Sequence, residues 1–189
     1  MVLAVDNLKE AIIGESNAKI NYELFAEQAQ KENYPEIAHL FRAISFAESI
    51  HIKNHAQAIA KITNSEVNVH EIVKIDKDQL KKQVNNTRNN LIKAIAGETF
   101  EFKKMYKNYK KKAKKEDMFL AEFSFDLARK AEIVHSKLYI NYLKQLDKKI
   151  NLLDVDIFVC KICGNVHLRE APKICPNCDH DQKFFKKID

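Results

Sequence analysis

The chain has 189 residues, a formal net charge of +6, and only three glycines and three prolines. That length suits one well-buried domain with a small appendage, and the scarcity of Gly and Pro favours long helices over sheets. No apolar run approaches the ~20 residues needed to cross a bilayer. Charges at Asp6, Lys9 and Glu10 exclude a signal-peptide core there. We therefore expect a cytoplasmic, mainly α-helical protein without a membrane partner.

Four stretches of the chain repeat apolar residues at alternating intervals of three and four, which is the spacing of amphipathic helices. These stretches are residues 8–29, 37–62, 80–105 and 121–146. Between the second and the third, residues 63–78 are polar and carry no helical period. We expect this segment to be the long irregular crossover of a ferritin-like four-helix bundle, because it is too long for a tight turn.

Glutamates interrupt these apolar stripes at positions that face the core. Carboxylates gathered in one core would repel one another and lose hydration, at several kcal/mol per ion. The chain can fold around them only if they are protonated or bound to cations. The five residues concerned are Glu15, Glu48, Glu98, Glu101 and Glu132.

Two Glu-x-x-His pairs lie on the second and fourth stripes, and each has another glutamate upstream, at 33 and 34 residues. A glutamate on each of two helices plus Glu-x-x-His on each of two others is the ligand set of a di-iron carboxylate bundle. Carboxylate together with imidazole suits iron or manganese better than magnesium or calcium. We therefore predict two irons, held by Glu15, Glu48, His51, Glu98, Glu132 and His135.

The two halves of the bundle look like an internal duplication. The sequence Gly-Glu-Ser at residues 14–16 recurs as Gly-Glu-Thr at residues 97–99. A glycine in a helix interior costs up to about 1 kcal/mol relative to alanine. We expect Gly14 and Gly97 to allow close helix approach beside the metals.

Three other side chains share the inward faces near the proposed ligands. Tyr22 and Tyr106 are either core aromatics or phenols that hydrogen-bond a ligand carboxylate, and the sequence leaves both readings open. His55 follows His51 by one helical turn on the same face. We interpret His55 as a hydrogen-bonded or core residue rather than a ligand.

Eight lysines between residues 103 and 115 account for much of the basic excess. We interpret them as the solvated outer face of a helix, and the alternative is a patch that docks an acidic redox partner or nucleic acid. No aromatic interleaving or nucleic-acid-binding motif accompanies them, so we expect no nucleic-acid partner.

All four cysteines lie in the last 30 residues as two Cys-x-x-Cys pairs. In a reducing compartment this pattern indicates metal thiolates rather than disulfides, and a four-sulfur site accepts iron or zinc. Gly164 follows the first pair, where the backbone must turn with positive φ. We divide the chain into a bundle at 1–148, a linker at 149–156 and a metal module at 157–189. The module's ligands are Cys160, Cys163, Cys175 and Cys178.

Along nearly its whole length the chain resembles the rubrerythrins, in which a ferritin-like di-iron bundle precedes a rubredoxin-like domain. The motifs that carry the resemblance are Gly14-Glu15-Ser16-x-Ala18, Glu48-x-x-His51, Gly97-Glu98-x-x-Glu101, Glu132-x-x-His135 and the two Cys-x-x-Cys pairs.

The resemblance implies reduction of hydrogen peroxide to water in oxidative-stress protection, with electrons passing from a single four-cysteine iron to the two irons of the bundle. It also implies that Glu101 is an additional ligand. In the family one iron shifts between a histidine when reduced and the extra glutamate when oxidised, and the matching residues are His51 and Glu101. Asn165 departs from the pattern, because rubredoxins commonly carry an aromatic residue there.

The alternative function is an iron-binding ferroxidase or storage protein with a structural zinc ribbon. Zinc can also replace iron at the four cysteines in recombinant protein. As a peroxidase the protein needs an external electron donor, either a rubredoxin or an NAD(P)H-dependent reductase, because it has no nucleotide-binding loop. The 16 residues from Glu132 to Lys148 span about 24 Å of helix, so we expect the module to lie far from its own di-iron site unless the linker at 149–156 folds fully back. We therefore predict a head-to-tail homodimer, as the family resemblance also implies.

Overall fold

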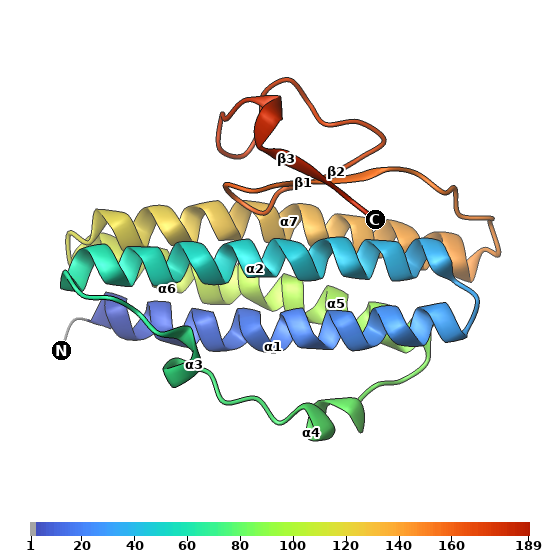
Figure 1. The fold of residues 1–189 in the computed structure, drawn as a ribbon, viewed down its shortest axis with the longest axis horizontal. Coiled ribbons are helices and arrows are strands. Elements are labelled where there is room, and N and C mark those ends of the chain that lie inside the picture. Colours follow the sequence, from blue (N-terminus) through green and yellow to red (C-terminus); the bar gives the residue numbers. More distant parts are fainter. Residues whose placement is uncertain (1–2) are drawn as a thin grey trace.

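The computed structural model describes residues 3–189, and its main body is a bundle of four long helical stretches (Figure 1). The first two are α1 (Leu3–Lys31) and α2 (Pro35–Thr63), which pack against each other. The third consists of α5 (Thr87–Phe100), η1 (Glu101–Met105) and α6 (Tyr106–Lys115), and it packs against α7 (Phe119–Asp147). The expected mainly α-helical, ferritin-like architecture is confirmed. No helix within residues 3–189 is long and apolar enough to span a membrane.

The crossover between the two halves differs from the expected irregular segment, because it contains two short helices. These are α3 (Val69–Ile72) and α4 (Lys77–Lys81). The side chain of Asn68 accepts a hydrogen bond from the backbone of His70, and that of Asp76 accepts one from Gln79. Each short helix therefore begins at a side-chain cap, which an apolar period does not reveal.

The third long helix begins later than the apolar stripe predicts. We expected it from residue 80, whereas α5 starts at Thr87. The Asn86 side chain accepts a hydrogen bond from the backbone of Asn89 and caps the helix. Leu80 and Val84 thus belong to the crossover, and the apolar period continues through the cap because Val84 still packs against the core.

A π-helical turn, η1, interrupts the third stretch at the point where Glu101 lies. The backbone N–H of Tyr106 donates to the carbonyl of Glu101, five residues earlier. A π turn contains one residue more than an α turn. Tyr106 consequently follows Glu98 by eight residues, whereas Tyr22 follows Glu15 by seven in the regular helix α1. The two tyrosines occupy equivalent places despite this difference in spacing.

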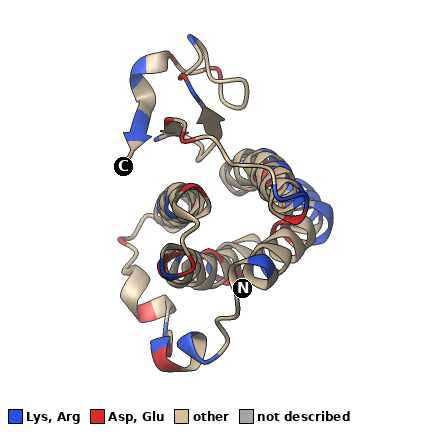
Figure 2. Cartoon of the chain, turned by 90° about the vertical axis from the view of Figure 1, so that its right-hand side faces the viewer, with Lys and Arg blue, Asp and Glu red and all other residues tan. Residues whose placement is uncertain are grey.

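The C-terminal module is a small antiparallel sheet with two metal-binding loops. Its strands are β1 (Ile157–Cys160), β2 (Val166–Leu168) and β3 (Phe185–Ile188), in the order β2-β1-β3, with a short 3₁₀ turn η2 (Gln182–Phe184) before the last strand. Views from two directions place the module and the crossover on opposite sides of the bundle (Figures 1 and 2).

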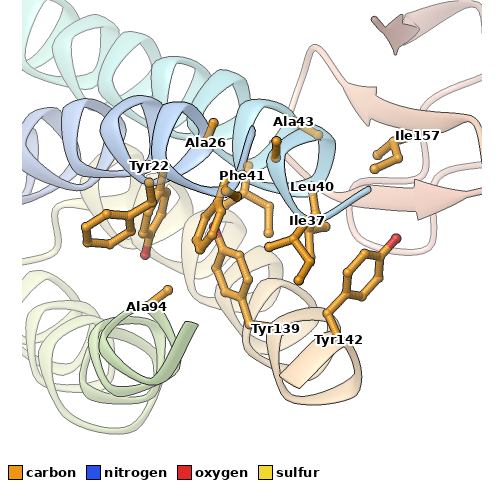
Figure 3. Close-up of a cluster of buried hydrophobic side chains, with 14 of the residues drawn as sticks. Tyr22, Ala26, Ile37, Leu40, Phe41, Ala43, Ala94, Tyr139, Tyr142 and Ile157 are labelled. Carbon is orange, nitrogen blue, oxygen red and sulfur yellow. The ribbon is translucent and has the colours of Figure 1, made fainter. Parts of the chain in front are cut away.

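The module shares a hydrophobic core with its own bundle. Ile157, Val159, Val166 and Ile188 lie in the same buried cluster as the apolar face of α2. Figure 3 shows Ile157 near Leu40 at one end of this cluster, which continues through Phe41 and Tyr139 to Tyr22. The module is therefore packed onto the bundle and is not a freely tethered appendage.

This placement corrects our expectation that the module lies far from its own di-iron site. Nine residues, 148–156, connect α7 to β1, and nine extended residues span roughly 30 Å. His135 lies twelve residues before Asp147, a distance of about 18 Å along the helix. The linker is therefore long enough to fold back along α7. The distance argument for a head-to-tail homodimer does not hold, and a homodimer stays a prediction.

Candidate metal centres

The structure brings six of the seven predicted bundle ligands into two adjoining groups. Within each group one potential ligand atom from every residue lies within 4.8 Å of the others. Glu48 and Glu132 belong to both groups, as expected of bridging carboxylates. Glu15 with His51 completes one group, and the other group is completed by Glu98 and His135.

The two histidines are oriented by the C-terminal module. Nε2 of His51 lies 3.2 Å from the carbonyl oxygen of Cys163, and Nε2 of His135 lies 3.0 Å from that of Gly164. A carbonyl oxygen can only accept, so Nε2 carries the proton in both imidazoles. The Nδ1 atoms then face the carboxylates, and in a neutral imidazole Nδ1 carries the lone pair that can bind a metal, which is the arrangement of a metal-binding histidine held by an outer hydrogen bond.

Unsatisfied buried atoms show that this cluster fits metal ions. Nδ1 of His51 lies 2.8 Å from Glu48 Oε2 and 2.9 Å from Glu132 Oε1, yet it has no hydrogen-bond partner of acceptable geometry. The same is true of His135 Nδ1 and of both carboxylate oxygens of Glu48 and Glu132. So many buried polar atoms without partners are costly unless cations bind them.

Electrostatics leads to the same conclusion. Burial, and then the charges of Glu48 and Glu132, raise the pKa of Glu15 to about 8. Burial also raises the pKa values of Glu98 and Glu101 well above the usual range of a carboxyl group. The protein alone therefore does not hold all these carboxylates ionised at neutral pH, and two multivalent cations would supply the missing positive charge.

Two buried tyrosines form hydrogen bonds with Glu15 and Glu98, the two glutamates that are not shared between the ligand groups. The Tyr22 hydroxyl donates to Glu98 Oε1 at 2.6 Å, and the Tyr106 hydroxyl donates to Glu15 Oε1. In both glutamates Oε2 has no hydrogen-bond partner within the described chain and stays available to a metal. Of the two readings left open by the sequence, the hydrogen-bonding one is confirmed.

Glu101, the seventh predicted ligand, lies beside the two groups rather than within either, among the residues described. It is only 9% exposed, and it lines a pocket of about 290 Å³ between α1 and the α5–η1 stretch. The same pocket is lined by Gly14, Gly97 and Tyr22. The π turn thus places Glu101 in the wall of this pocket.

The role that we expected of the two mid-helix glycines is wrong. A Cβ built at Gly14 would meet no atom within 4 Å, and one at Gly97 would meet only the Tyr22 hydroxyl, at 3.9 Å. No neighbouring helix approaches either glycine closely. Both instead line the pocket that Glu101 also lines.

The four cysteines form a second centre in the module. Cys160 Sγ lies 3.7 Å from Cys178 Sγ, and Cys163 Sγ lies 3.6 Å from Cys175 Sγ. Sulfurs placed tetrahedrally at ~2.3 Å from a metal are about 3.8 Å apart. The separations fit one tetrahedral metal, and they are too long for disulfide bonds.

Gly164 is where the two centres come into contact. Its φ is +75°, as the sequence predicted, and a Cβ there would lie 2.4 Å from His51 Nε2 and 3.2 Å from the Ala47 carbonyl oxygen. Side chains on both sides support this contact, since Asn54 donates to the Ile162 carbonyl at 2.8 Å and Asn177 donates to that of Leu127 at 3.1 Å. Only a glycine fits between α2 and the metal-binding loop, or knuckle, formed by residues 160–164.

We predict that Gly164→Ala uncouples the module from the bundle without removing metal from either centre. The left-handed backbone conformation costs a non-glycine residue roughly 1–2 kcal/mol, and the added methyl group overlaps the His51 ring. In the function proposed below, electrons pass between the two centres, and this transfer, followed by stopped-flow absorption, should slow markedly. Gly14→Ala is the matched control, because its added methyl group meets nothing. Wild-type transfer rates in Gly164→Ala would contradict the assigned contact.

Together, a carboxylate–histidine dimetal site inside a four-helix bundle and a docked four-cysteine centre define a non-haem dimetal protein with an attached one-metal module. A family model described as rubrerythrin matches residues 6–143, and one described as the rubrerythrin rubredoxin-like domain matches residues 158–186. The chain belongs to the rubrerythrin family.

Similar proteins support this assignment over nearly the whole chain. Rubrerythrin-2 of Clostridium acetobutylicum is 32% identical over 185 residues, covering 97% of this chain and 96% of that protein. Nigerythrin of Nitratidesulfovibrio vulgaris is 32% identical over 183 residues, covering 96% of this chain and 84% of that protein. A structure of partially reduced nigerythrin is similar with a TM-score of 0.84 at 30% identity, covering 97% and 86% of the two chains.

Iron is the metal that fits both centres. A related structure, with a TM-score of 0.82 at 30% identity, is described as fully reduced, all-ferrous nigerythrin. Carboxylate and imidazole ligands suit iron in the bundle, and four thiolates suit iron in the module. The predicted cofactors, two irons in the bundle and one at the four cysteines, are thereby supported by geometry and by family.

Proposed function

We propose that this protein is a di-iron peroxidase that reduces hydrogen peroxide to water, with electrons delivered through its four-cysteine iron. The observation that carries this proposal is the pair of hydrogen bonds from His51 and His135 to the backbone carbonyls of Cys163 and Gly164. One of these carbonyls belongs to a thiolate ligand and the other to its neighbour. A redox module held directly on the ligands of a second centre is suited to pass electrons to it.

The reaction balances with the groups that the chain provides. Hydrogen peroxide, two electrons and two protons give two water molecules, as the O–O bond breaks and two O–H bonds form. Two irons held by the carboxylate and histidine groups would supply the two electrons by passing from the diferrous to the diferric state. An attached one-electron carrier is useful only if the centre turns over, which favours an enzyme over an iron store. An external reductant must then restore the four-cysteine iron.

The chain's own residues shape a route for a small polar substrate. The pocket of about 290 Å³ that Glu101 lines also has Asn17, Asn21 and Lys93 in its lining. Hydrogen-bonding groups along the route suit hydrogen peroxide better than an apolar hydroperoxide. In the family-based reading, Glu101 and His51 are the two residues between which one iron shifts.

The remaining parts of the proposal concern the cell and the partners. Four thiols arranged around one metal suit a reducing compartment, so we infer a cytoplasmic protein that protects against oxidative stress. The electron donor would be a rubredoxin or an NAD(P)H-dependent reductase.

Seven of the eight lysines at 103–115 have no ion pair within residues 3–189, which agrees with a solvated outer face.

One preparation can test the function against its alternative. Protein purified from its native host should be red, with the spectrum of a high-spin ferric thiolate, and should consume peroxide when a reductase supplies electrons. A storage protein with a structural zinc ribbon would instead have a colourless module. It would oxidise ferrous iron but would not turn over peroxide catalytically. That second result would overturn the proposal.

Glu101→Ala should separate peroxide turnover from iron binding. Glu101 lies outside both ligand groups among the described residues, so most of the iron should stay bound. Peroxide turnover should fall by about tenfold or more, which corresponds to at least ~1.4 kcal/mol in the barrier. Stopped-flow rates with peroxide and with dioxygen, on samples of measured iron content, provide the check. Glu27→Ala, at an exposed position of α1, is the control. An unchanged peroxide rate would refute the role of Glu101.

A further inference from the structure

A buried chain of hydrogen bonds extends from the bundle wall to Glu15. Ser124 Oγ lies 2.7 Å from His55 Nδ1, His55 Nε2 lies 2.9 Å from the Tyr106 hydroxyl, and this hydroxyl contacts Glu15 Oε1. His55 and Tyr106 are fully buried, and Ser124 is 5% exposed. Both ring nitrogens of His55 are occupied by these contacts, so it is not free to bind a metal.

The direction of every bond in this chain is determined by its last member. An ionised Glu15 can only accept, so the single hydroxyl hydrogen of Tyr106 points to it. The Tyr106 oxygen must then accept from His55 Nε2–H, which leaves His55 Nδ1 to accept from the Ser124 hydroxyl. Burial lowers the pKa of His55 to about 3, which agrees with a neutral imidazole.

The other half of the duplicated bundle has no such chain. His55 follows His51 by four residues, and the residue in the same place after His135 is Tyr139. Tyr139 packs against Tyr22 with ring centroids 5.5 Å apart, but its hydroxyl has no hydrogen-bond partner within residues 3–189. Tyr22 therefore holds Glu98 without an imidazole behind it. The difference affects only the metal position that Glu15 shares with His51.

We propose that His55, backed by Ser124, is a positioning residue that sets the hydrogen bond from Tyr106 to Glu15 and thereby tunes one of the two irons. This inference rests on the proposed metal site. A hydrogen bond received by a phenol strengthens the one that it donates. A stronger bond to Glu15 Oε1 withdraws electron density from the carboxylate, keeps Oε2 as the metal-binding oxygen, and favours the ferrous state of that iron.

The test compares variants in the ⁵⁷Fe-loaded full chain. His55→Leu removes the donor to Tyr106, His55→Gln keeps an N–H at the Nε2 position, and Tyr106→Phe removes the bond to Glu15. Tyr139→Phe is the matched control from the other half. Iron content is measured first, then Mössbauer spectra and the reduction potential of the di-iron centre. Far-UV circular dichroism of the helices reports that the bundle of each variant is folded, and the ferric-thiolate absorption reports the same for the module.

We expect His55→Leu to change the Mössbauer signal of one iron only and to lower the reduction potential, with His55→Gln restoring both. The double variant His55→Leu/Tyr106→Phe should match Tyr106→Phe alone, because His55 acts through Tyr106. Wild-type spectra and potential in His55→Leu, equal changes at both irons, or additive effects would overturn the inference. If His55→Leu does not fold, His55→Gln is compared with Tyr106→Phe instead. A His55→Gln protein with the same altered Mössbauer signal and reduction potential as Tyr106→Phe would then overturn the inference. A wild-type chain without two irons would instead refute the site itself.

Discussion

Glu132→Ala and Glu48→Ala should each strip the bundle of nearly all its iron. Both residues contribute to both ligand groups, and all four of their carboxylate oxygens lack hydrogen-bond partners in the described chain. Loss of a group that merely supports a ligand costs about 10–100-fold in metal affinity, so loss of a shared ligand should cost more. Iron analysis and the di-iron absorption spectrum measure the effect.

Two comparisons make this prediction sharp. Glu98→Ala changes a residue of one group only, so it should weaken one metal position more than the other. Glu27→Ala, on the exposed part of α1, should keep both irons. The metal-free form of Glu132→Ala should unfold at a lower denaturant concentration than metal-free wild type, because Glu132 is a carboxylate that contacts both His51 and His135, and its removal leaves these buried imidazoles without that partner. Two irons retained in both Glu48→Ala and Glu132→Ala would refute the ligand assignment.

Cys160→Ser should abolish peroxide turnover driven by an external reductase, while a chemically reduced di-iron centre should still react once. Cys160 is fully buried and is one of four ligands of the module's metal. Without it electrons cannot enter through the module. Steady-state peroxide consumption and single-turnover oxidation of pre-reduced protein distinguish the two steps.

The same variant tests whether electrons stay within one chain. Because the knuckle after Cys160 contacts the His51 of its own bundle, mixing Cys160→Ser with Glu132→Ala should restore no turnover, even if the two chains associate. Each variant would hold one working centre beside one defective centre. Recovery of activity in mixed assemblies would instead show that modules exchange between chains, as the head-to-tail homodimer predicts.

Much of the bundle follows from sequence because each part leaves a local signal. The stripes predicted four helical stretches, and carboxylates at stripe positions predicted a buried charged cluster that needs cations. The caps at Asn68, Asp76 and Asn86 were missed because an apolar period contains no information about capping. The π turn did leave a trace, since the interval from ligand to tyrosine is seven residues in one repeat and eight in the other.

The position of the module on the bundle could not be predicted from local sequence signals. Linker length limits how far the module can lie, but contact with α2 decides where it lies. That contact depends on apolar residues of β1 and β3 matching the outer face of α2, and on Gly164 fitting against His51. Each residue alone resembles an ordinary strand or knuckle position. Likewise, the sequence indicated that His55 is a hydrogen-bonded or core residue, but it could not identify the partners, which are the hydroxyls of Ser124 and Tyr106.

The extra residue in η1 has an evolutionary consequence. A duplicated gene first encodes two equal halves, and equal halves would give both metal positions the same surroundings. Substitutions change the equivalence of the two halves one side chain at a time. One inserted residue instead turns every later side chain of the helix by about 100° around the helix axis. Only a turn that absorbs the insertion, as η1 does before Tyr106, keeps the rest of the helix in register. A single insertion could thus make twin sites unequal while the fold survived.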